Sequence, residues 1–348
     1  MGVRVTRAIV DAASAEGGSP SGRLTTSRYL MPIANQPLIC HVLGELARGG
    51  IEDAEIVSCN GVRAELQKLL GTGDSWGVRL TFVEVDAGHG REAVQTEIRR
   101  SVAEEAVLVY PGDCLFPGQI QPMRQRFGDG DVDLVLLAHA TADASRGWVR
   151  KLMRAEEQPA RVADTAMILG PATQDALDQL SSNGNAEEGV VEALLAAEHP
   201  FAVCELGEHW CYSDTTEELL AGNQIMLDAL PITPVRGTLG DSNEVLGRVQ
   251  ISSSARVSSS TVHGPAVIAD GAIVEDSFIG PYTSIGPGAV VMGTEIDNTI
   301  VMSGAVIRHP GARIEASVIG ERACISRSFE LPKGLHMRVG PDSQISLS

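Results

Sequence analysis

Aliphatic residues recur every five or six positions through the C-terminal third of the 348-residue chain. A glycine or another small residue usually follows each of them, as in Ile279-Gly280 and Ile285-Gly286. This pattern is typical of hexapeptide repeats, in which each short strand ends at a corner and stacked coils share one core. It favours a β-helix from about residue 245 over the alternative, a β-sandwich with short strands. The expected inward residues are Ile251, Val257, Val262, Ile268, Val274, Ile279, Ile285, Val291, Ile296, Val301, Val306, Ile314, Ile319 and Ile325.

The first 230 or so residues show a different pattern, in which short apolar runs alternate with amphipathic segments. Strands that alternate with helices indicate an α/β domain with a doubly wound, mostly parallel sheet covered on both faces. The expected strands are residues 5–10, 54–58, 78–85, 106–110 and 132–138, and the expected helices are residues 37–48, 62–70, 96–104 and 219–230.

The change of period divides the chain into two domains. Residues 1–232 form the expected α/β domain, and residues 245–348 form the expected coil domain. Residues 233–244 are rich in Pro, Gly and Ser, which is typical of a linker. A chain of this length agrees with two domains.

The charge balance excludes several kinds of partner. The formal net charge is −18, so a nucleic-acid backbone or an anionic membrane surface would be repelled. A phosphorylated ligand therefore needs a local device such as backbone N–H groups, arginines or a metal ion. None of the six cysteines is spaced C-x-x-C, and no apolar run is long enough to span a membrane. We expect a cytoplasmic, thiol-reducing location and no zinc site.

Five stretches resemble motifs of one protein family. Residues 29–37 read Y-L-M-P-I-A-N-Q-P and resemble K-x-L-x-P-V-x-N-K-P, and residues 70–78 resemble G-D-G-x-x-W-G-V. Residues 110–114 resemble L-G-D-N, and residues 217–223 resemble E-D-L-L-E-A-N. Residues 279–286, I-G-P-Y-T-S-I-G, resemble the C-terminal left-handed β-helix of long-form glucose-1-phosphate thymidylyltransferases. Over nearly its whole length the chain thus resembles the sugar-1-phosphate nucleotidyltransferases.

The resemblance implies a reaction and its ligands. A sugar 1-phosphate oxygen attacks the α-phosphorus of a nucleoside triphosphate, giving an NDP-sugar and pyrophosphate, with dTTP and glucose 1-phosphate as the implied substrates. The protein must hold the triphosphate, neutralise developing charge and align the attack. In this family a glycine-rich loop, basic side chains and a Mg²⁺ ion held by two aspartates meet these needs. The family also implies a homo-oligomer and a role in deoxysugar biosynthesis.

The family's glycine-rich loop has two alignments in this chain. Without gaps, its glycines fall on Ala13 and Ser14 and its arginine on Gly18, which destroys the loop. A shifted alignment reads residues 17–24 as G-G-S-P-S-G-R-L, with one inserted residue. We favour the shifted alignment, although a plain surface loop is the alternative. It assigns the nucleotide-binding role to Gly17, Gly18, Ser19 and Gly22, and a catalytic role to Arg23.

The remaining expected site residues are assigned one by one, each from its own position in the alignment with the family. Arg28 replaces the lysine that follows the loop and is the expected catalytic cation, while Gly90 matches a glycine near the sugar. Asp113 is the expected catalytic and metal-binding aspartate, or else a simple turn residue. The second metal ligand is expected at Asp214 if two residues are inserted. Without the insertion Tyr212 takes that place.

Other positions depart from the family pattern in ways that predict an eroded site. A lysine position is Gln36, another falls near Arg154-Ala155 or in residues 157–159, and the base-reading glutamine is Val85. Two alternatives therefore follow from the resemblance. The protein is either a weakly active nucleotidyltransferase or an inactive homologue that acts as a ligand sensor or as a structural partner of another protein. A third alternative is acyl transfer by the coil, but no loop signature accompanies its histidines, which are His263, His309 and His336.

Overall fold

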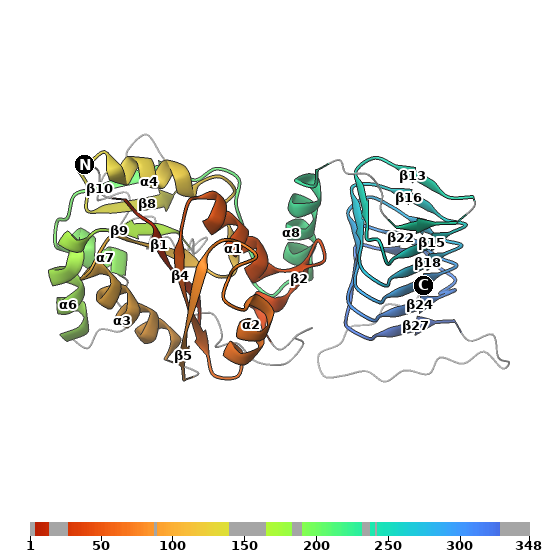
Figure 1. Ribbon diagram of the computed structural model, residues 1–348, viewed down its shortest axis with the longest axis horizontal. Coiled ribbons are helices and arrows are strands. Elements are labelled where there is room, and N and C mark those ends of the chain that lie inside the picture. Colours follow the sequence, from red (N-terminus) through yellow and green to blue (C-terminus); the bar gives the residue numbers. More distant parts are fainter. Residues whose placement is uncertain are drawn as a thin grey trace. The chain divides into compact units, whose positions relative to one another are not determined.

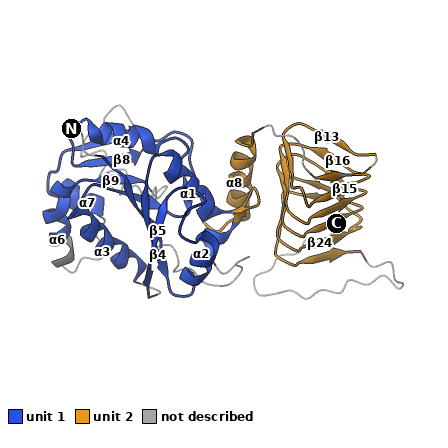
Figure 2. Cartoon of the chain, in the orientation of Figure 1, with its two compact units in different colours: residues 1–18, 25–31, 37–212 blue, residues 19–24, 32–36, 213–348 orange. Residues whose placement is uncertain are grey.

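The computed structural model describes residues 4–13, 27–86, 89–138, 165–182, 190–231, 237–240 and 242–327. The chain forms two compact units, coloured separately in Figure 2. The first unit contains residues 1–18, 25–31 and 37–212, and the second contains residues 19–24, 32–36 and 213–348. The expected domain boundaries at 232 and 245 stay a prediction.

The first unit is built on a seven-stranded sheet (Figure 1). Only β9 runs antiparallel to its neighbours, β6 and β8, and the other paired strands are parallel. Every residue of β6 and β8 is buried, as expected where helices cover both faces of a sheet. The doubly wound, mostly parallel sheet is thus confirmed. In order across the sheet, the strands are β10 (Phe201–Glu205), β8 (Leu134–Ala138), β9 (Met167–Leu169), β6 (Val107–Pro111), β1 (Arg7–Ala12), β4 (Asp53–Cys59) and β5 (Arg79–Val85).

The helices of this unit follow the expected amphipathic pattern. In α1 the apolar stripe that begins at Leu38 is fully buried, and Pro37 precedes the helix. Helix α3 packs against β1, β4 and β6, whereas α4 packs against β8, β9 and β10. The helices are α1 (Leu38–Arg48), α2 (Arg63–Leu70), α3 (Gly90–Val102), α4 (Ile120–Gly128), α6 (Gln174–Ser182) and α7 (Val190–Ala196).

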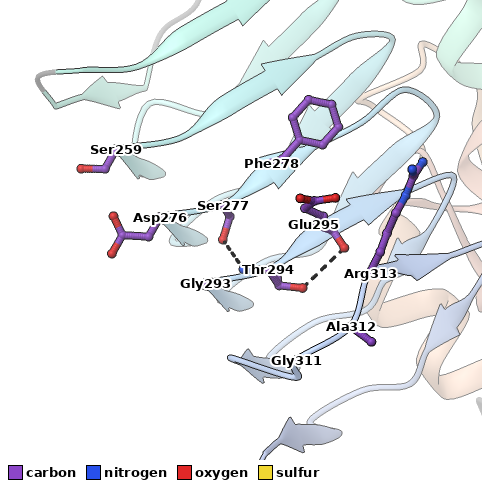
Figure 3. A pocket seen from close by; sticks show the side chains of 10 residues that line it. All are labelled: Ser259, Asp276, Ser277, Phe278, Gly293, Thr294, Glu295, Gly311, Ala312 and Arg313. Carbon is purple, nitrogen blue, oxygen red and sulfur yellow. Dashed lines mark hydrogen bonds between the residues drawn. The ribbon is translucent and has the colours of Figure 1, made fainter.

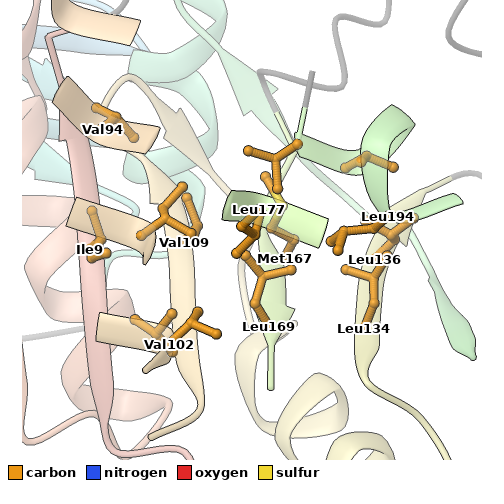
Figure 4. Packing of buried hydrophobic residues seen from close by; sticks show 14 of the residues in the cluster. Ile9, Val94, Val102, Val109, Leu134, Leu136, Met167, Leu169, Leu177 and Leu194 are labelled. Atoms are coloured by element: carbon orange, nitrogen blue, oxygen red, sulfur yellow. The ribbon is translucent and has the colours of Figure 1, made fainter. Parts of the chain in front are cut away.

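One hydrophobic cluster joins the sheet to α3, α6 and α7, and Figure 4 shows part of it. Ile9 of β1 and Val109 of β6 contribute from the sheet, and Val102 contributes from α3. Leu136 of β8 and Leu194 of α7 extend the same cluster. The cluster holds the strands in a fixed register, and therefore fixes where their carboxyl ends lie.

The strand order reverses at β1 and β6. From β1 the chain winds outward through β4 and β5, and then returns to β6 on the other side of β1. The two strands lie side by side, with Asp11 opposite Pro111. In open α/β sheets, ligands bind at the carboxyl ends of strands where the order reverses. We call this edge, the carboxyl ends of β1 and β6, the mouth of the sheet.

The second unit is dominated by a coil of short parallel strands in three sheets, which confirms the β-helix (Figure 1). Successive coils stack in register, so that Ile268 lies beside Ile285 and Ile285 beside Val301. The first sheet contains β12 (Thr238–Leu239), β15 (Arg256–Ser258), β18 (Ile273–Glu275), β21 (Val290–Met292), β24 (Val306–Arg308) and β27 (Cys324–Ser326). The second contains β13 (Glu244–Leu246), β16 (Thr261–His263), β19 (Phe278–Ile279), β22 (Glu295–Asp297) and β25 (Ile314–Glu315). The third contains β14 (Val249–Ile251), β17 (Ala266–Ile268), β20 (Thr283–Ile285), β23 (Ile300–Val301) and β26 (Val318–Ile319).

Most of the predicted inward aliphatic residues line one continuous core. All ten from Ile251 to Val301 are buried in it, and Ile319 joins them, while Ile314 and Ile325 pack at its edge. Val306 corrects the expectation, because its neighbour Ile307 is the fully buried residue and Val306 is half-buried. Successive side chains of a strand alternate between its faces, so only one of these two neighbours can point inward.

Helix α8 (Thr216–Asp228) packs within the second unit through a buried amide. Asn223 Oδ1 accepts hydrogen bonds from Ala34 N at 2.9 Å and from Ser284 Oγ at 2.7 Å. Asn223 Nδ2 donates to the Tyr282 carbonyl oxygen at 2.9 Å, and Asn35 Nδ2 donates to that of Ile285 at 2.8 Å. Asparagines of two family-like motifs therefore anchor α8 and the segment after β2 (Pro32–Ile33) to the coil.

Among the helices that the structure describes, none combines the length and the apolar character needed to cross a membrane.

Candidate functional site

An arginine and an aspartate meet at the mouth of the sheet. Asp113 follows β6 after one glycine, and Arg28 begins a short 3₁₀ helix that Ser27 caps. Arg28 Nη1 lies 2.7 Å from Asp113 Oδ2, and the two side chains are 13% and 11% exposed. Such a buried, charge-assisted pair holds both groups firmly. The structure therefore brings together two predicted site residues that lie far apart in the sequence.

Tyr212 completes this arrangement from a third segment. Arg28 Nη1 also donates to the Tyr212 carbonyl oxygen at 3.2 Å, and the guanidinium carbon lies 5.9 Å from the centre of the tyrosine ring. The Tyr212 N–H in turn donates to the Asp113 carbonyl oxygen at 3.0 Å. We call these three residues the Arg28 cluster. Its tyrosine stands where a gap-free alignment expected an aspartate, so the position supports the cation through its carbonyl and ring.

A second carboxylate lies close to the cluster. Burial raises the pKa of Asp113, the Arg28 guanidinium lowers it, and the charge of Asp11 raises it again, with a net increase. Asp11 is the last residue but one of β1, and its Oδ1 accepts a hydrogen bond from Ala13 N at 3.0 Å. Sequence reasoning missed Asp11, although an aspartate near the end of an apolar first strand was a usable signal. The mouth thus contains one guanidinium and two acidic groups.

Two glycines allow the backbones at the mouth to approach closely. A Cβ at Gly112 would lie 2.8 Å from the Asp11 carbonyl oxygen, and a Cβ at Gly90 would lie 2.5 Å from that of Ala13. The Gly112 N–H donates to the Asp11 carbonyl oxygen at 2.8 Å. Gly90 therefore lets the start of α3 pack against the end of β1, where the predicted loop begins. Its expected contact with a sugar stays a prediction.

A disulfide lies directly beside the Arg28 cluster. Cys114 of β7 (Cys114–Leu115) is bonded to Cys211 of β11 (Trp210–Cys211), and the two strands run antiparallel. This bond corrects the expectation of reduced thiols, which the cysteine spacing supported because the two partners are 97 positions apart. The usable signal was that one cysteine follows Asp113 and the other precedes Tyr212.

The metal expectation was tested against the donor atoms at the mouth. No group of three histidines, cysteines, aspartates or glutamates that could hold a metal occurs among the described residues. Asp113 Oδ2 already accepts from a guanidinium, which would repel a cation at the same oxygen. Asp214 belongs to the second unit, where its φ is 67°. The expected pair of Asp113 and Asp214 is therefore not shown to form a Mg²⁺ site, and Mg²⁺ stays a prediction.

Several predicted site residues lie outside the described residues. They are Gly17, Gly18, Ser19, Gly22 and Arg23 of the loop, together with residues 154–159. Of the positions that depart from the family, Gln36 is exposed in β3 (Gln36–Pro37). Val85 ends β5 and packs partly buried against the main cluster of the unit, which gives it no base-reading group.

The coil carries a separate hollow of about 550 Å³, which Figure 3 shows. Its turn hydroxyls are already bonded within the coil, since Ser277 Oγ accepts from Thr294 N at 3.4 Å. Arg313 at its rim is paired with Asp297 at 2.6 Å, and the ring of Phe278 contacts His263. The hollow therefore offers less for a phosphate than the mouth of the sheet does.

Comparison with known proteins shows similarity to nucleotidyltransferases that act on sugar phosphates, although no family model matches the chain. It is 24% identical over 340 residues to a glucose-1-phosphate thymidylyltransferase of Streptomyces antibioticus, covering 93% of this chain and 94% of that protein. It is 28% identical over 341 residues to a low-salt glycan biosynthesis nucleotidyltransferase of Haloferax volcanii. This match covers 93% of this chain and 95% of that protein.

A solved structure shows the fold. This protein of Bacillus anthracis, assigned as a glucose-1-phosphate thymidylyltransferase and crystallised with sucrose, superposes with a TM-score of 0.51 at 16% identity. The match covers 64% of this chain and 94% of that one. Similarity to such enzymes along 93% of the chain agrees with the motifs and with the sheet and coil described above. The chain is thus similar, along nearly its whole length, to enzymes of the sugar-1-phosphate nucleotidyltransferase family.

Proposed function

We propose that this protein transfers a nucleotidyl group from a nucleoside triphosphate to a sugar 1-phosphate, and that its turnover is low because its site is eroded. The names of two relatives support glucose 1-phosphate and a thymidine nucleotide as the first substrates to test. The products are an NDP-sugar and pyrophosphate.

The observation that carries this proposal is the Arg28 cluster at the mouth of the sheet. Arg28, paired with Asp113, holds a guanidinium at the strand ends where open α/β sheets bind ligands. A guanidinium can engage phosphate oxygens with paired donors, and an always-charged group needs no proton transfer to do so. In a chain with a net charge of −18, such a local cation is what an anionic substrate requires.

The residues of the mouth would contribute by orientation and by charge. Asp113 and the Tyr212 carbonyl hold two sides of the Arg28 guanidinium, and the tyrosine ring supports its face. A positioned cation stabilises negative charge that grows on phosphate oxygens as the sugar phosphate attacks and pyrophosphate leaves. Nucleotidyl transfer requires no covalent bond to the protein, so binding and alignment of the two substrates form the main contribution of the chain.

The cations missing from the family pattern support low turnover. Gln36 is neutral and exposed where the family has a lysine, and Arg28 shares its charge with a buried carboxylate. Losing one group that meets transition-state charge costs about 3 kcal/mol, or at least a hundredfold in rate. Two partly additive losses would leave turnover well below that of an intact site.

A second candidate function is ligand sensing without turnover. The Arg28–Asp113 pair favours it, because the carboxylate expected to bind a metal is engaged by a side chain of the same unit. The cluster could bind a phosphate ligand and yet lack the second cation that transfer needs.

One paired experiment separates the two candidates. Calorimetry measures binding of nucleoside triphosphates and sugar 1-phosphates, and pyrophosphate release is assayed on the same panel with saturating Mg²⁺ and with EDTA. Slow release supports the first proposal, and binding alone supports sensing. Release at the rate of an intact relative contradicts erosion, and absence of both binding and release contradicts both candidates.

Restoring a missing cation tests the cause of the low turnover. Gln36→Lys should raise pyrophosphate release several-fold, whereas Gln67→Lys, which adds the same charge to an exposed position of α2, should not. An equal response to both substitutions would show that only the overall charge matters.

The remaining expectations from the family are proposals of the same kind. A homo-oligomer would elute from size-exclusion chromatography with a light-scattering mass that is a multiple of 36.7 kDa. The cytoplasmic location also stays a prediction.

A further inference from the structure

The disulfide joins the two chain segments that hold Arg28. Cys114 directly follows Asp113, whose carboxylate pairs with the arginine, and Cys211 directly precedes Tyr212, whose carbonyl oxygen and ring contact it. The Tyr212 N–H also donates to the Asp113 carbonyl oxygen at 3.0 Å. The bond therefore lies one residue away from both supports of the cation.

The two strands themselves are short. Strands β7 and β11 have two residues each, and among the described strands they form a two-stranded sheet of their own. A two-stranded pair is marginally stable at best, and here a long stretch of chain separates the strands. A covalent link between them removes that freedom, so the disulfide constrains the position of Tyr212 in addition to the hydrogen bond and the packing of that residue.

The two sulfur atoms differ in accessibility. Cys114 is fully buried, whereas the residue Cys211 is partly exposed, so we expect an external thiolate to attack at Cys211. Of the free cysteines that the structure describes, Cys40 is buried, and burial raises the pKa of its thiol to about 11. Cys40 therefore stays a protonated thiol near neutral pH and does not attack the disulfide.

We propose that the Cys114–Cys211 disulfide positions Arg28 at the mouth of the sheet, and that its reversible reduction weakens binding of phosphate ligands there. This inference rests on the proposed function, because it assigns a regulation to the same site. In cytosolic proteins, disulfides are uncommon and usually serve redox sensing or catalysis. A redox-responsive bond reconciles the disulfide with the expected cytoplasmic location.

The chemistry of the switch is thiol–disulfide exchange. A dithiol reductant attacks the Cys211 sulfur as a thiolate, the S–S bond breaks, and Cys114 leaves as a thiolate that takes up a proton. The second thiol of the reductant then releases Cys211 and forms the oxidised reductant. Two electrons and two protons pass from the reductant to the protein, and a small-molecule disulfide reverses the exchange.

The first test measures the affinity of the whole protein for inorganic pyrophosphate by calorimetry, before and after treatment with dithiothreitol. Differential alkylation and mass spectrometry establish the bond in the untreated protein. Reduction should weaken binding about tenfold, because Arg28 loses its fixed position. The double variant Cys114→Ser/Cys211→Ser should bind pyrophosphate with the affinity of the reduced protein, and dithiothreitol should not change that affinity. The control Cys324→Ser removes an exposed free thiol and should respond to dithiothreitol as the wild type does.

Hydrogen exchange gives a second measurement that does not depend on ligand binding. Reduction should speed exchange in peptides that contain Tyr212, whose N–H bonds to Asp113, and leave peptides of the coil unchanged. An absent bond in the untreated protein, or unchanged exchange on reduction, overturns the inference even if pyrophosphate binds. Equal pyrophosphate affinity in both redox states also overturns it. If pyrophosphate binds in neither redox state, the proposed function and the redox control of ligand binding both fail. Faster hydrogen exchange on reduction would then support only the claim that the disulfide positions Tyr212.

Discussion

The coil of the second unit and the mouth of the sheet in the first unit are stabilised in different ways. In the coil, each strand repeats the contacts of the strand one turn earlier, and Val262, Ile279 and Ile296 form one column of buried side chains. At the mouth, the Arg28 cluster draws single residues from three distant segments, and no contact is repeated. When one contact of the coil is lost, the equivalent contacts in neighbouring turns still hold the strands in place. When one contact of the Arg28 cluster is lost, no equivalent contact remains to hold the other residues. Four substitutions test this contrast.

The largest effect is expected from a charge placed in the repeated core. Ile285→Asp buries an unpaired carboxylate in a fully buried position and should destabilise the coil by about 3–5 kcal/mol. Urea unfolding followed by circular dichroism measures the change. Thr261→Asp, at an outward and half-buried coil position, is the matched control and should cost far less. Equal effects of the two substitutions would contradict the assignment of inward and outward faces.

The next effect concerns the mouth alone. Asp113→Asn removes the charge that holds Arg28 and should lower residual pyrophosphate release at least about a hundredfold. Far-ultraviolet circular dichroism should stay that of the wild type, because the sheet does not depend on this carboxylate. Wild-type turnover in the variant would remove Asp113 from the mechanism.

A smaller loss is expected where α8 packs within the second unit. Asn223→Ala leaves the Ala34 N–H and the Ser284 hydroxyl without their buried acceptor and should cost about 1–3 kcal/mol. Gln224→Ala on the same helix removes a single side-chain hydrogen bond, to Asn298, and should cost less. Thermal unfolding of both variants measures the difference. A larger loss for Gln224→Ala would show that the buried amide is not the main anchor.

The smallest effect is expected from a change that keeps the charge at the mouth. Arg28→Lys retains an ion pair with Asp113 but loses the planar group that also contacts Tyr212. Pyrophosphate affinity should fall by about 0.5–1.5 kcal/mol, the usual value of one hydrogen bond. Calorimetry measures it, with Arg63→Lys on α2 as a control. Tighter binding by Arg28→Lys would mean that the family's lysine suits this mouth better than the arginine does.

Much of the fold could be predicted because its signals are local. The predicted strand at residues 54–58 lies within β4, and the predicted helix at 37–48 differs from α1 by one residue. Strand β9 was missed because three apolar residues carry no period that separates them from a loop. Its antiparallel direction depends on the strands at its two sides, and only the folded sheet defines these.

The candidate site likewise contains some features that local sequence signals predict and others that they do not. Arg28 and Asp113 could be identified as single residues from the motifs around them, and the structure shows that they form an ion pair. The disulfide and the support from Tyr212 could not be found in the same way, because each depends on which distant segments become neighbours. Asp214 and the loop residues 17–23 stay predictions.

The coil, the alternation of strands and helices, and the resemblance to one family could all be predicted from the sequence. These features follow from the spacing of apolar residues, which acts over a few positions and is the same in every repeat. Only the tertiary structure decided that an arginine pairs with the aspartate expected to bind a metal, and that a disulfide lies beside the pair. Ion pairs and disulfides require contact in space, and the spacing of residues along a chain does not encode that contact when nearly a hundred positions separate the partners.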